Sequence, residues 1–222
     1  MALLETPRFV VFDFDGVLAD TDRAWFSVVR EELAAVGAVT TIDALIAGHR
    51  GMVITESVLE FERAFSITLP SGWVDRVVGR ALAEVEHGFK PIPGAVDAVR
   101  LVDAADLPLA VASGSLRHAL ASGLNRLGID DVVDDRFVSS HDNGKHKPLP
   151  DVYLRACARL GLPPEQGVAV EDSVIGIASA RAAGLKVIGF SPTEGADAGA
   201  LLSAGAAVVI TRMTDLPDAL SI

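Results

Sequence analysis

Near both ends of the chain, short apolar runs alternate with amphipathic segments. The runs lack the polar alternation of a half-exposed strand, so they predict strands buried on both faces of a parallel sheet. The amphipathic segments between them predict helices that cover the sheet. The expected strands are 9–12, 107–112, 137–138, 167–170, 186–190 and 206–210. We therefore expect an α/β fold with a Rossmann-like parallel sheet core.

The middle of the chain has a different pattern. Apolar residues recur there every three or four positions, in four stripes, which is typical of helices that bury one face. The last of these stripes consists of Val74, Val78, Leu82 and Val85. Stripes of this period are what a small helical bundle requires. We expect residues 21–90 to form an inserted α-helical cap, and residues 1–20 and 91–222 to form the catalytic core.

Composition narrows the class of protein. The chain has 222 residues, of which 50% are hydrophobic, and a formal net charge of -11. An acidic chain repels nucleic acid and anionic membrane surfaces, so we expect neither as a partner. No apolar run reaches the length of a membrane span, and Cys157, the single cysteine, cannot form an internal disulfide. We therefore expect a cytoplasmic protein, and a monomer.

Polar clusters follow four of the expected strands. They are Asp13, Asp15 and Gly16; Ser113, Gly114 and Ser115; Lys147, within a polar loop; and Glu171 and Asp172. Because the carboxyl ends of parallel strands open on one crevice, we expect these clusters to meet. Each cluster alone also has a structural interpretation, as a turn, a helix cap or a solvated loop. Their joint order is what indicates a site.

The four clusters combine groups that suit phosphate chemistry. Asp13 and Asp15 repel each other, and a divalent cation or a shared proton is the usual compensation. A set of carboxylates suits Mg²⁺, which proteins hold through one or two carboxylates together with water and substrate phosphate. Ser113 and the N–H groups after it can bind a phosphate, and Lys147 can neutralise its charge. A nucleophile, a cation and phosphate donors together indicate phosphoryl transfer.

With these motifs, the chain resembles the haloacid dehalogenase-like hydrolase superfamily. The resemblance covers nearly the whole chain and rests on D-x-D-G from Asp13, the serine of VASGS, K-P-L-P-D from Lys147 and E-D-S-x-x-G from Glu171. The helical insertion after the first motif is similar to the type 1 cap of the β-phosphoglucomutase-like and phosphatase branch.

The resemblance implies a role for each motif. Asp13 attacks the substrate phosphorus and becomes an aspartyl phosphate, while Asp15 protonates the leaving alcohol and then activates water. The implied Mg²⁺ ligands are the Asp13 carboxylate, the Asp15 backbone carbonyl and Asp172, with Glu171 supporting the ion through water. The implied phosphate-binding groups are Ser113, Gly114 and Lys147.

Differences from the motifs of related enzymes reduce the number of reactions that we expect this chain to catalyse. Dehalogenases lack the second aspartate, so Asp15 argues against dehalogenation. Residues 21–89 contain no lysine, which argues against the Schiff base of phosphonoacetaldehyde hydrolases. Trp25 stands where β-phosphoglucomutases carry a histidine, and it cannot shuttle protons. We expect a Mg²⁺-dependent phosphatase acting on a small phosphorylated metabolite of the sugar phosphate or phosphogluconate type. A β-phosphoglucomutase-like mutase and a catalytically silent phosphometabolite-binding protein remain as alternatives.

Substrate specificity is expected to come from the cap. His49 and Arg50 lie between two glycines in the expected cap, and an arginine there can contact a second anionic group of the substrate. Arg117 and His118, just beyond the serine motif, are further candidates to border the substrate pocket.

Overall fold

The chain divides into two compact units. The computed structural model describes residues 6–49, 54–192 and 198–222. One unit, the sheet unit, comprises Met1–Ala19 and Pro91–Ile222, and the other, the helical unit, comprises Asp20–Lys90. The short strands β2 (Ala19–Asp20) and β3 (Lys90–Pro91), where the chain passes between the units, pair with each other.

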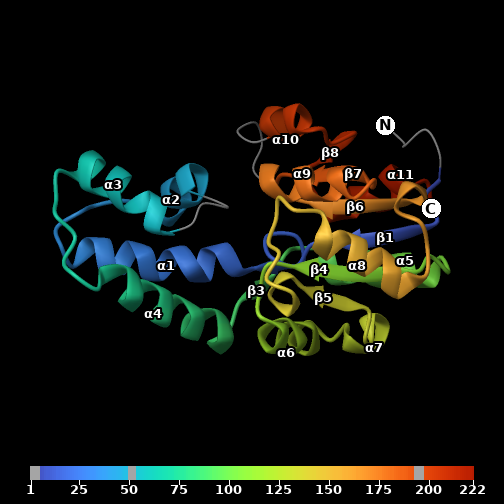
Figure 1. Cartoon of the computed structure of the whole chain (residues 1–222), viewed down its shortest axis with the longest axis horizontal. Coiled ribbons are helices and arrows are strands. Elements are labelled where there is room, and N and C mark those ends of the chain that lie inside the picture. The colour runs from blue at the N-terminus through green and yellow to red at the C-terminus, as the bar shows by residue number, and fades with distance from the viewer. Residues whose placement is uncertain (1–5, 50–53, 193–197) are drawn as a thin grey trace. The chain divides into compact units, whose positions relative to one another are not determined.

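A six-stranded parallel sheet forms the centre of the sheet unit (Figure 1). The strand order is β5-β4-β1-β6-β7-β8, so β1 lies between β4 and β6. The strands are β1 (Phe9–Phe12), β4 (Leu109–Ser113), β5 (Phe137–Ser139), β6 (Gly167–Glu171), β7 (Lys186–Phe190) and β8 (Val208–Ile210). In register, Val11 lies opposite Ala110 on one side and Ala169 on the other, so the carboxyl ends of the three strands lie at the same edge of the sheet. The expected fold class is confirmed.

Helices follow the strands and cover the sheet. They are α5 (Ala95–Ala104), α6 (Arg117–Leu127), α7 (Asp130–Val133), α8 (Asp151–Leu160), α9 (Val174–Ala182), α10 (Ala198–Ala204) and α11 (Leu216–Leu220), with 3-10 turns η1 (Ser140–Asp142), η2 (Pro164–Gln166) and η3 (Met213–Asp215). Residues of α8, α9 and α10 pack against the sheet face that carries Phe9 and Val11, and this core includes the buried Cys157. Among the described helices, none has the length and apolar character to cross a membrane.

The helical unit has a core of its own. It contains α1 (Thr21–Ala34), α2 (Ile42–His49), α3 (Ile54–Phe65) and α4 (Trp73–His87). The predicted stripe on α4 is confirmed in part, because Val74 and Val78 are partly buried and pack against this core. The face that is buried carries Trp73, Val77 and Ala81, whereas Leu82 is 44% exposed. One residue turns a helix by about 100°, so a stripe chosen by the largest aliphatic side chains lies beside the most buried line of the helix, which begins at Trp73.

Candidate active site

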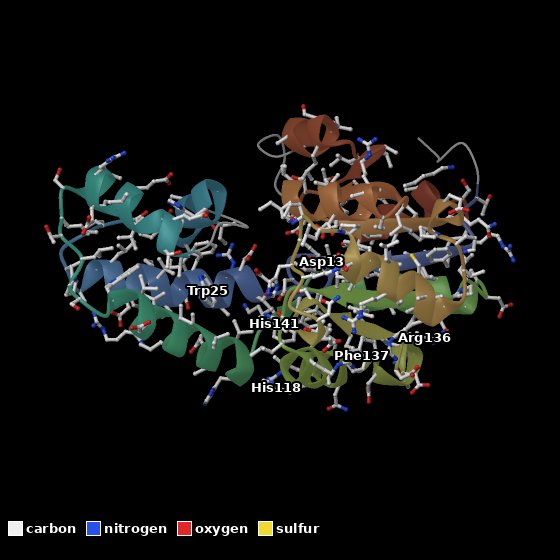
Figure 2. The ribbon with its side chains drawn as sticks, in the orientation of Figure 1. Asp13, Trp25, His118, Arg136, Phe137 and His141 are labelled. Carbon is white, nitrogen blue, oxygen red and sulfur yellow. The ribbon has the colours of Figure 1, made fainter. Side chains whose placement is uncertain are left out.

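The turn after β1 places the first two aspartates. The Asp13 N–H donates to the Val170 carbonyl at 3.0 Å, so Asp13 still follows the line of the sheet (Figure 2). The chain then turns at Gly16, whose φ of 78° favours glycine. A Cβ at Gly16 would also lie 1.9 Å from Asp172 Oδ2. Glycine is therefore required here both by the turn and by the close approach of the acidic loop after β6.

Asp13 and Lys147 form a buried ion pair at the carboxyl end of β1. The Lys147 ammonium donates to Asp13 Oδ1 at 2.8 Å and to Glu171 Oε1 at 2.6 Å, and the lysine side chain is 13% exposed. Burial opposes the lysine charge, but the two carboxylates outweigh it and raise the pKa of Lys147 above its usual value. Lys147 therefore stays protonated and can neutralise an anion beside Asp13.

Asp13 has more negative than positive groups around it. Burial raises the pKa of Asp13, Lys147 lowers it, and the carboxylates of Glu171 and Asp15 raise it further. An added cation at this position would favour the ionised form of Asp13, which is the form that can act as a nucleophile.

Glu171 accepts an unusually large number of hydrogen bonds for one carboxylate. Its Oε1 accepts from Lys147 Nζ and from the Tyr153 hydroxyl at 2.7 Å. Its Oε2 accepts from the backbone N–H groups of Asp172 and Ser173 and from the Ser173 hydroxyl, at 3.0 to 3.1 Å. A carboxylate offers about four acceptor positions, so these five donors saturate it. In this arrangement Glu171 serves as an anchor for Lys147.

Asp15 faces the serine-bearing turn after β4. The hydroxyls of Ser113 and Ser115 donate to Asp15 Oδ2 at 2.8 and 2.9 Å. Ser113 Oγ in turn accepts from the Ser115 N–H at 2.8 Å. Gly114 is exposed, and a Cβ there would meet no atom within 4 Å. The turn thus joins Asp15 through two hydroxyls and leaves space around Gly114.

Three acidic side chains come close enough together to bind a cation. Asp13, Glu171 and Asp172 each offer a carboxylate oxygen, and these oxygens lie within 4.8 Å of one another. All three side chains are buried, and Lys147 supplies a single positive charge against them. Oxygen donors of this kind fit Mg²⁺. The donor chemistry and the surplus of negative charge both fit a divalent ion.

The four predicted clusters meet in the sheet unit, whereas the predicted cap residue His49 belongs to the helical unit. His49 is mostly buried there and packs against Phe61, with ring centroids 4.6 Å apart. Burial lowers the pKa of His49, opposed by Glu60. Arg50 lies outside the described residues, so both cap assignments stay predictions. Arg117, in the sheet unit, is held by Asp142 instead of being directed at Asp13.

A hollow of about 300 Å³ opens within the helical unit. Its lining includes Asp20, Arg23, Ser27, Glu84 and Lys90. Because charges of both signs line it, electrostatics alone selects no class of ligand for this hollow.

Two participants were missed in the sequence. Tyr153, the single tyrosine, is fully buried and reaches Glu171, and burial followed by the Glu171 charge raises its pKa, so the hydroxyl stays protonated. Ser173 contributes a hydroxyl and an N–H to the same carboxylate. A buried tyrosine needs a polar partner, so a lone tyrosine near the start of the helix after Lys147 was the available signal.

Comparison with known proteins matches most of the chain to one family. Residues 7–184 match the family model described as haloacid dehalogenase-like hydrolase. Hexitol phosphatase B of Escherichia coli (strain K12) is 31% identical over 190 residues, covering 83% of this chain and 85% of that protein. Fructose-1-phosphate phosphatase of the same organism is 32% identical over 183 residues, covering 81% of this chain and 94% of that protein.

A solved structure extends the similarity to the fold. A conserved haloacid dehalogenase-like protein of unknown function from Agrobacterium tumefaciens superposes with a TM-score of 0.88 at 32% identity. The match covers 96% of this chain and 97% of that one. The sequence match and the structural match thus point to the same family of hydrolases.

Proposed function

The chain belongs to the haloacid dehalogenase-like hydrolase family, and from this premise we propose that it is a Mg²⁺-dependent phosphatase of small phosphorylated sugars. It is a phosphoric monoester hydrolase, and its relatives include proteins named as hexitol and fructose-1-phosphate phosphatases. The single observation that carries the proposal is the buried Asp13–Lys147–Glu171 arrangement beside Asp15. It combines a nucleophile, a fixed cation and an acid–base group.

The proposed reaction has two steps, both carried by the aspartates. In the first, an Asp13 carboxylate oxygen bonds to the substrate phosphorus, the bond from phosphorus to the sugar oxygen breaks, and Asp15 gives that oxygen a proton. In the second, Asp15 takes a proton from water, whose oxygen bonds to the phosphorus and releases phosphate and the Asp13 carboxylate. The Ser113 and Ser115 hydroxyls hold Asp15 where it can serve in both steps.

The phosphoryl oxygens are proposed to bind to Lys147 and to the serine-bearing turn. Lys147 lies against Asp13 at 2.8 Å, so it neutralises the repulsion between an anionic nucleophile and an anionic phosphate. On the other side, the open backbone at Gly114 supplies an N–H donor. The Ser113 hydroxyl has one proton, so it donates to the phosphoryl group by turning away from Asp15, which Ser115 continues to hold.

Asp13 and Asp172 are the carboxylates we propose to bind Mg²⁺ directly, together with the Asp15 backbone carbonyl. Glu171 belongs to the same acidic group, but its oxygens already accept five hydrogen bonds. It therefore acts on the ion indirectly, through water or by holding Lys147. When bound, the ion supplies additional positive charge for the phosphoryl group.

The test is phosphate release from a panel of sugar phosphates, hexitol phosphates and phosphogluconate, with and without EDTA. We expect release that stops on chelation and returns with Mg²⁺. Asp13→Asn should lower kcat at least ~10³-fold, because an amide is a poor nucleophile. Asp135→Asn, at an aspartate whose side chain is 80% exposed, is the matched control and should match the wild type. Undiminished phosphate release in the presence of EDTA, or by the Asp13→Asn variant, would contradict this mechanism.

A phosphosugar mutase is the competing function. It would convert a hexose 1-phosphate to its 6-phosphate without net phosphate release and would need a bisphosphate primer. Trp25, on α1, packs against the core of the helical unit and has no group that exchanges protons (Figure 2). This residue supports the phosphatase, and assaying both products in one reaction separates the two functions.

A further inference from the structure

Two loops deliver the phosphate-binding groups, and they come from neighbouring strands. The serine loop, residues 113–116, follows β4 and carries Ser113. The lysine loop, residues 140–150, follows β5 and carries Lys147. The loops touch at their bases, where the Ser139 hydroxyl donates to the Ser115 carbonyl at 2.6 Å. Their relative position therefore sets the distance between the two sides of a bound phosphate.

An arginine–aspartate cluster, Arg117, Asp142 and Arg155, joins the same loops a second time. Arg117 donates to both Asp142 oxygens, from Nε at 2.9 Å and from a terminal nitrogen at 2.6 Å. Arg155 donates to Asp142 Oδ2 at 3.0 Å. Bidentate arginine–carboxylate pairs fix orientation as well as distance. The cluster can therefore fix the position of the serine loop relative to the lysine loop.

Each member of the cluster belongs to a different element. Arg117 begins α6, directly beyond the serine loop, and its guanidinium lies over the Phe137 ring, 5.0 Å from the ring centroid. Asp142 ends η1 within the lysine loop, and its carboxylate also accepts from the Ser139 N–H at 3.4 Å. Arg155 lies on α8, which follows the lysine loop, and donates to the Ser139 carbonyl at 3.1 Å. The Asp142 carboxylate thus joins η1 to Arg117 of α6 and to Arg155 of α8.

The Asp142 side chain is well suited to be a permanent anion. The residue as a whole is exposed, yet its side chain is 15% exposed. Hydrogen bonds from Arg117, opposed by burial and assisted by Arg155, lower the pKa of Asp142 to about 2. The carboxylate therefore stays ionised, and able to accept from both arginines, throughout the pH range of enzyme assays.

We propose that Asp142 is a positioning residue that holds the serine loop and the lysine loop at the separation required for phosphate binding. The inference rests on the proposed phosphatase function. Asp142 acts through Arg117 and through the backbone of the lysine loop, and it is not assigned to the reacting groups. Displacing a substrate-binding group by about 1 Å can lower activity on the order of 100-fold. A modest relaxation of the two loops is therefore enough to weaken phosphate binding.

The test compares Asp142→Asn with Asp131→Asn. The control also loses an aspartate held by two nitrogens of one arginine, Arg100, but this pair precedes β5 instead of following it. We expect Asp142→Asn to raise both KM and the inhibition constant of inorganic phosphate about tenfold, with a smaller change in kcat. Asp131→Asn should leave all three constants at the wild-type value. Constants are taken per folded enzyme, with the melting temperature of each variant recorded.

A second variant separates positioning from stability. Arg117→Met removes the partner on the serine-loop side, so it should raise the phosphate inhibition constant as Asp142→Asn does. Because both changes break one link, the double variant should be no worse than either single one. Full additivity, or an Asp142→Asn enzyme that melts earlier but keeps the wild-type KM and inhibition constant, overturns the proposal.

Hydrogen exchange gives a readout that does not depend on activity. Asp142→Asn should speed exchange in peptides from the serine loop and the lysine loop, and leave β1 and β6 unchanged. Unchanged loops, or equally faster exchange throughout the sheet unit, overturn the proposal. Should the wild type release phosphate from no substrate, the proposed function fails by itself, and this measurement still decides the role of Asp142.

Discussion

Single residues explain why Asp13 and Asp15 have different chemistry despite their closeness in sequence. Asp13 faces an ammonium group that is itself held by Glu171, whereas Asp15 faces two serine hydroxyls. Lys147 opposes the burial that raises the pKa of Asp13, whereas the Asp15 carboxylate accepts hydrogen bonds from two neutral hydroxyls. Both residues are aspartates, so their different proposed roles follow from their different hydrogen-bond partners.

The lowered pKa of Asp142 predicts a pH-dependent contribution to stability. A carboxyl group with a folded-state pKa of about 2 and an unfolded value near 3.8 stabilises the protein above pH ~4. That contribution is lost as the pH falls from ~4 to ~2, because the unfolded state then binds the proton first. The difference in unfolding free energy between wild type and Asp142→Asn should therefore be constant from pH 5 to 7 and shrink below pH 4. Urea unfolding at each pH measures it, and a difference that stays constant down to pH 2.5 would contradict the assigned ionisation.

The position at which helix α9 begins helps to fix the geometry of the candidate active site. Helix α9 starts immediately after the acidic loop, and Ser173 caps it by accepting from the Gly176 N–H at 3.0 Å. A Cβ on Gly176 would lie 1.8 Å from Glu171 Oε1, so the first turn of this helix presses directly on the carboxylate that holds Lys147. The helix start and the anchor are therefore one structural unit.

Gly176→Ala should therefore damage activity through Glu171. The methyl group forces the Glu171 side chain away from Lys147 and Tyr153, so we expect kcat/KM to fall about 100-fold and stability to fall by about 1–3 kcal/mol. Gly79→Ala is the control, because a Cβ at this position on α4 meets no atom within 4 Å. It should be neutral or stabilise by about 0.5–1 kcal/mol. Phosphate-release kinetics and urea unfolding of both variants measure this, and an unimpaired Gly176→Ala enzyme would argue against the anchor role.

The elements were largely readable from the sequence, and the exceptions have physical causes. The strand of residues 9–12 was predicted because an unbroken apolar run between Arg8 and Asp13 is typical of a strand buried on both faces, and β1 confirms it. The α4 stripe was right in part: Val74 and Val78 pack against the core, whereas Leu82 is exposed because the most buried side chains lie one position earlier. The bond from Tyr153 to Glu171 joins residues 18 apart through side chains, which no local periodicity encodes. Short-range pattern therefore predicts elements, whereas side-chain partners across loops require the fold.

At the scale of the whole molecule, the two units have separate cores and separate optical probes. Both tryptophans, Trp25 and Trp73, lie in the helical unit, and the only tyrosine lies in the sheet unit. Tryptophan fluorescence therefore follows the helical unit alone, while exchange at β1 and β6 follows the sheet unit. A ligand that binds one unit can be traced to that unit by which probe responds.

Mg²⁺ should stabilise the sheet unit selectively. A ligand at 100 times its dissociation constant adds about 2.7 kcal/mol to the folded state, which for a domain of this size raises the melting temperature by roughly 5–10 °C. We expect that shift in the exchange-monitored melting of β1 and β6 and a smaller one in tryptophan fluorescence. The chain carries a net charge of -11, so NaCl of equal ionic strength must be run to subtract simple screening. Asp172→Asn should abolish the Mg²⁺-specific part while Asp135→Asn keeps it, because Asp172 belongs to the buried acidic group and the Asp135 side chain is exposed. An equal shift in NaCl, or an undiminished shift in Asp172→Asn, would place the ion elsewhere and remove the metal from the proposed chemistry at Asp13.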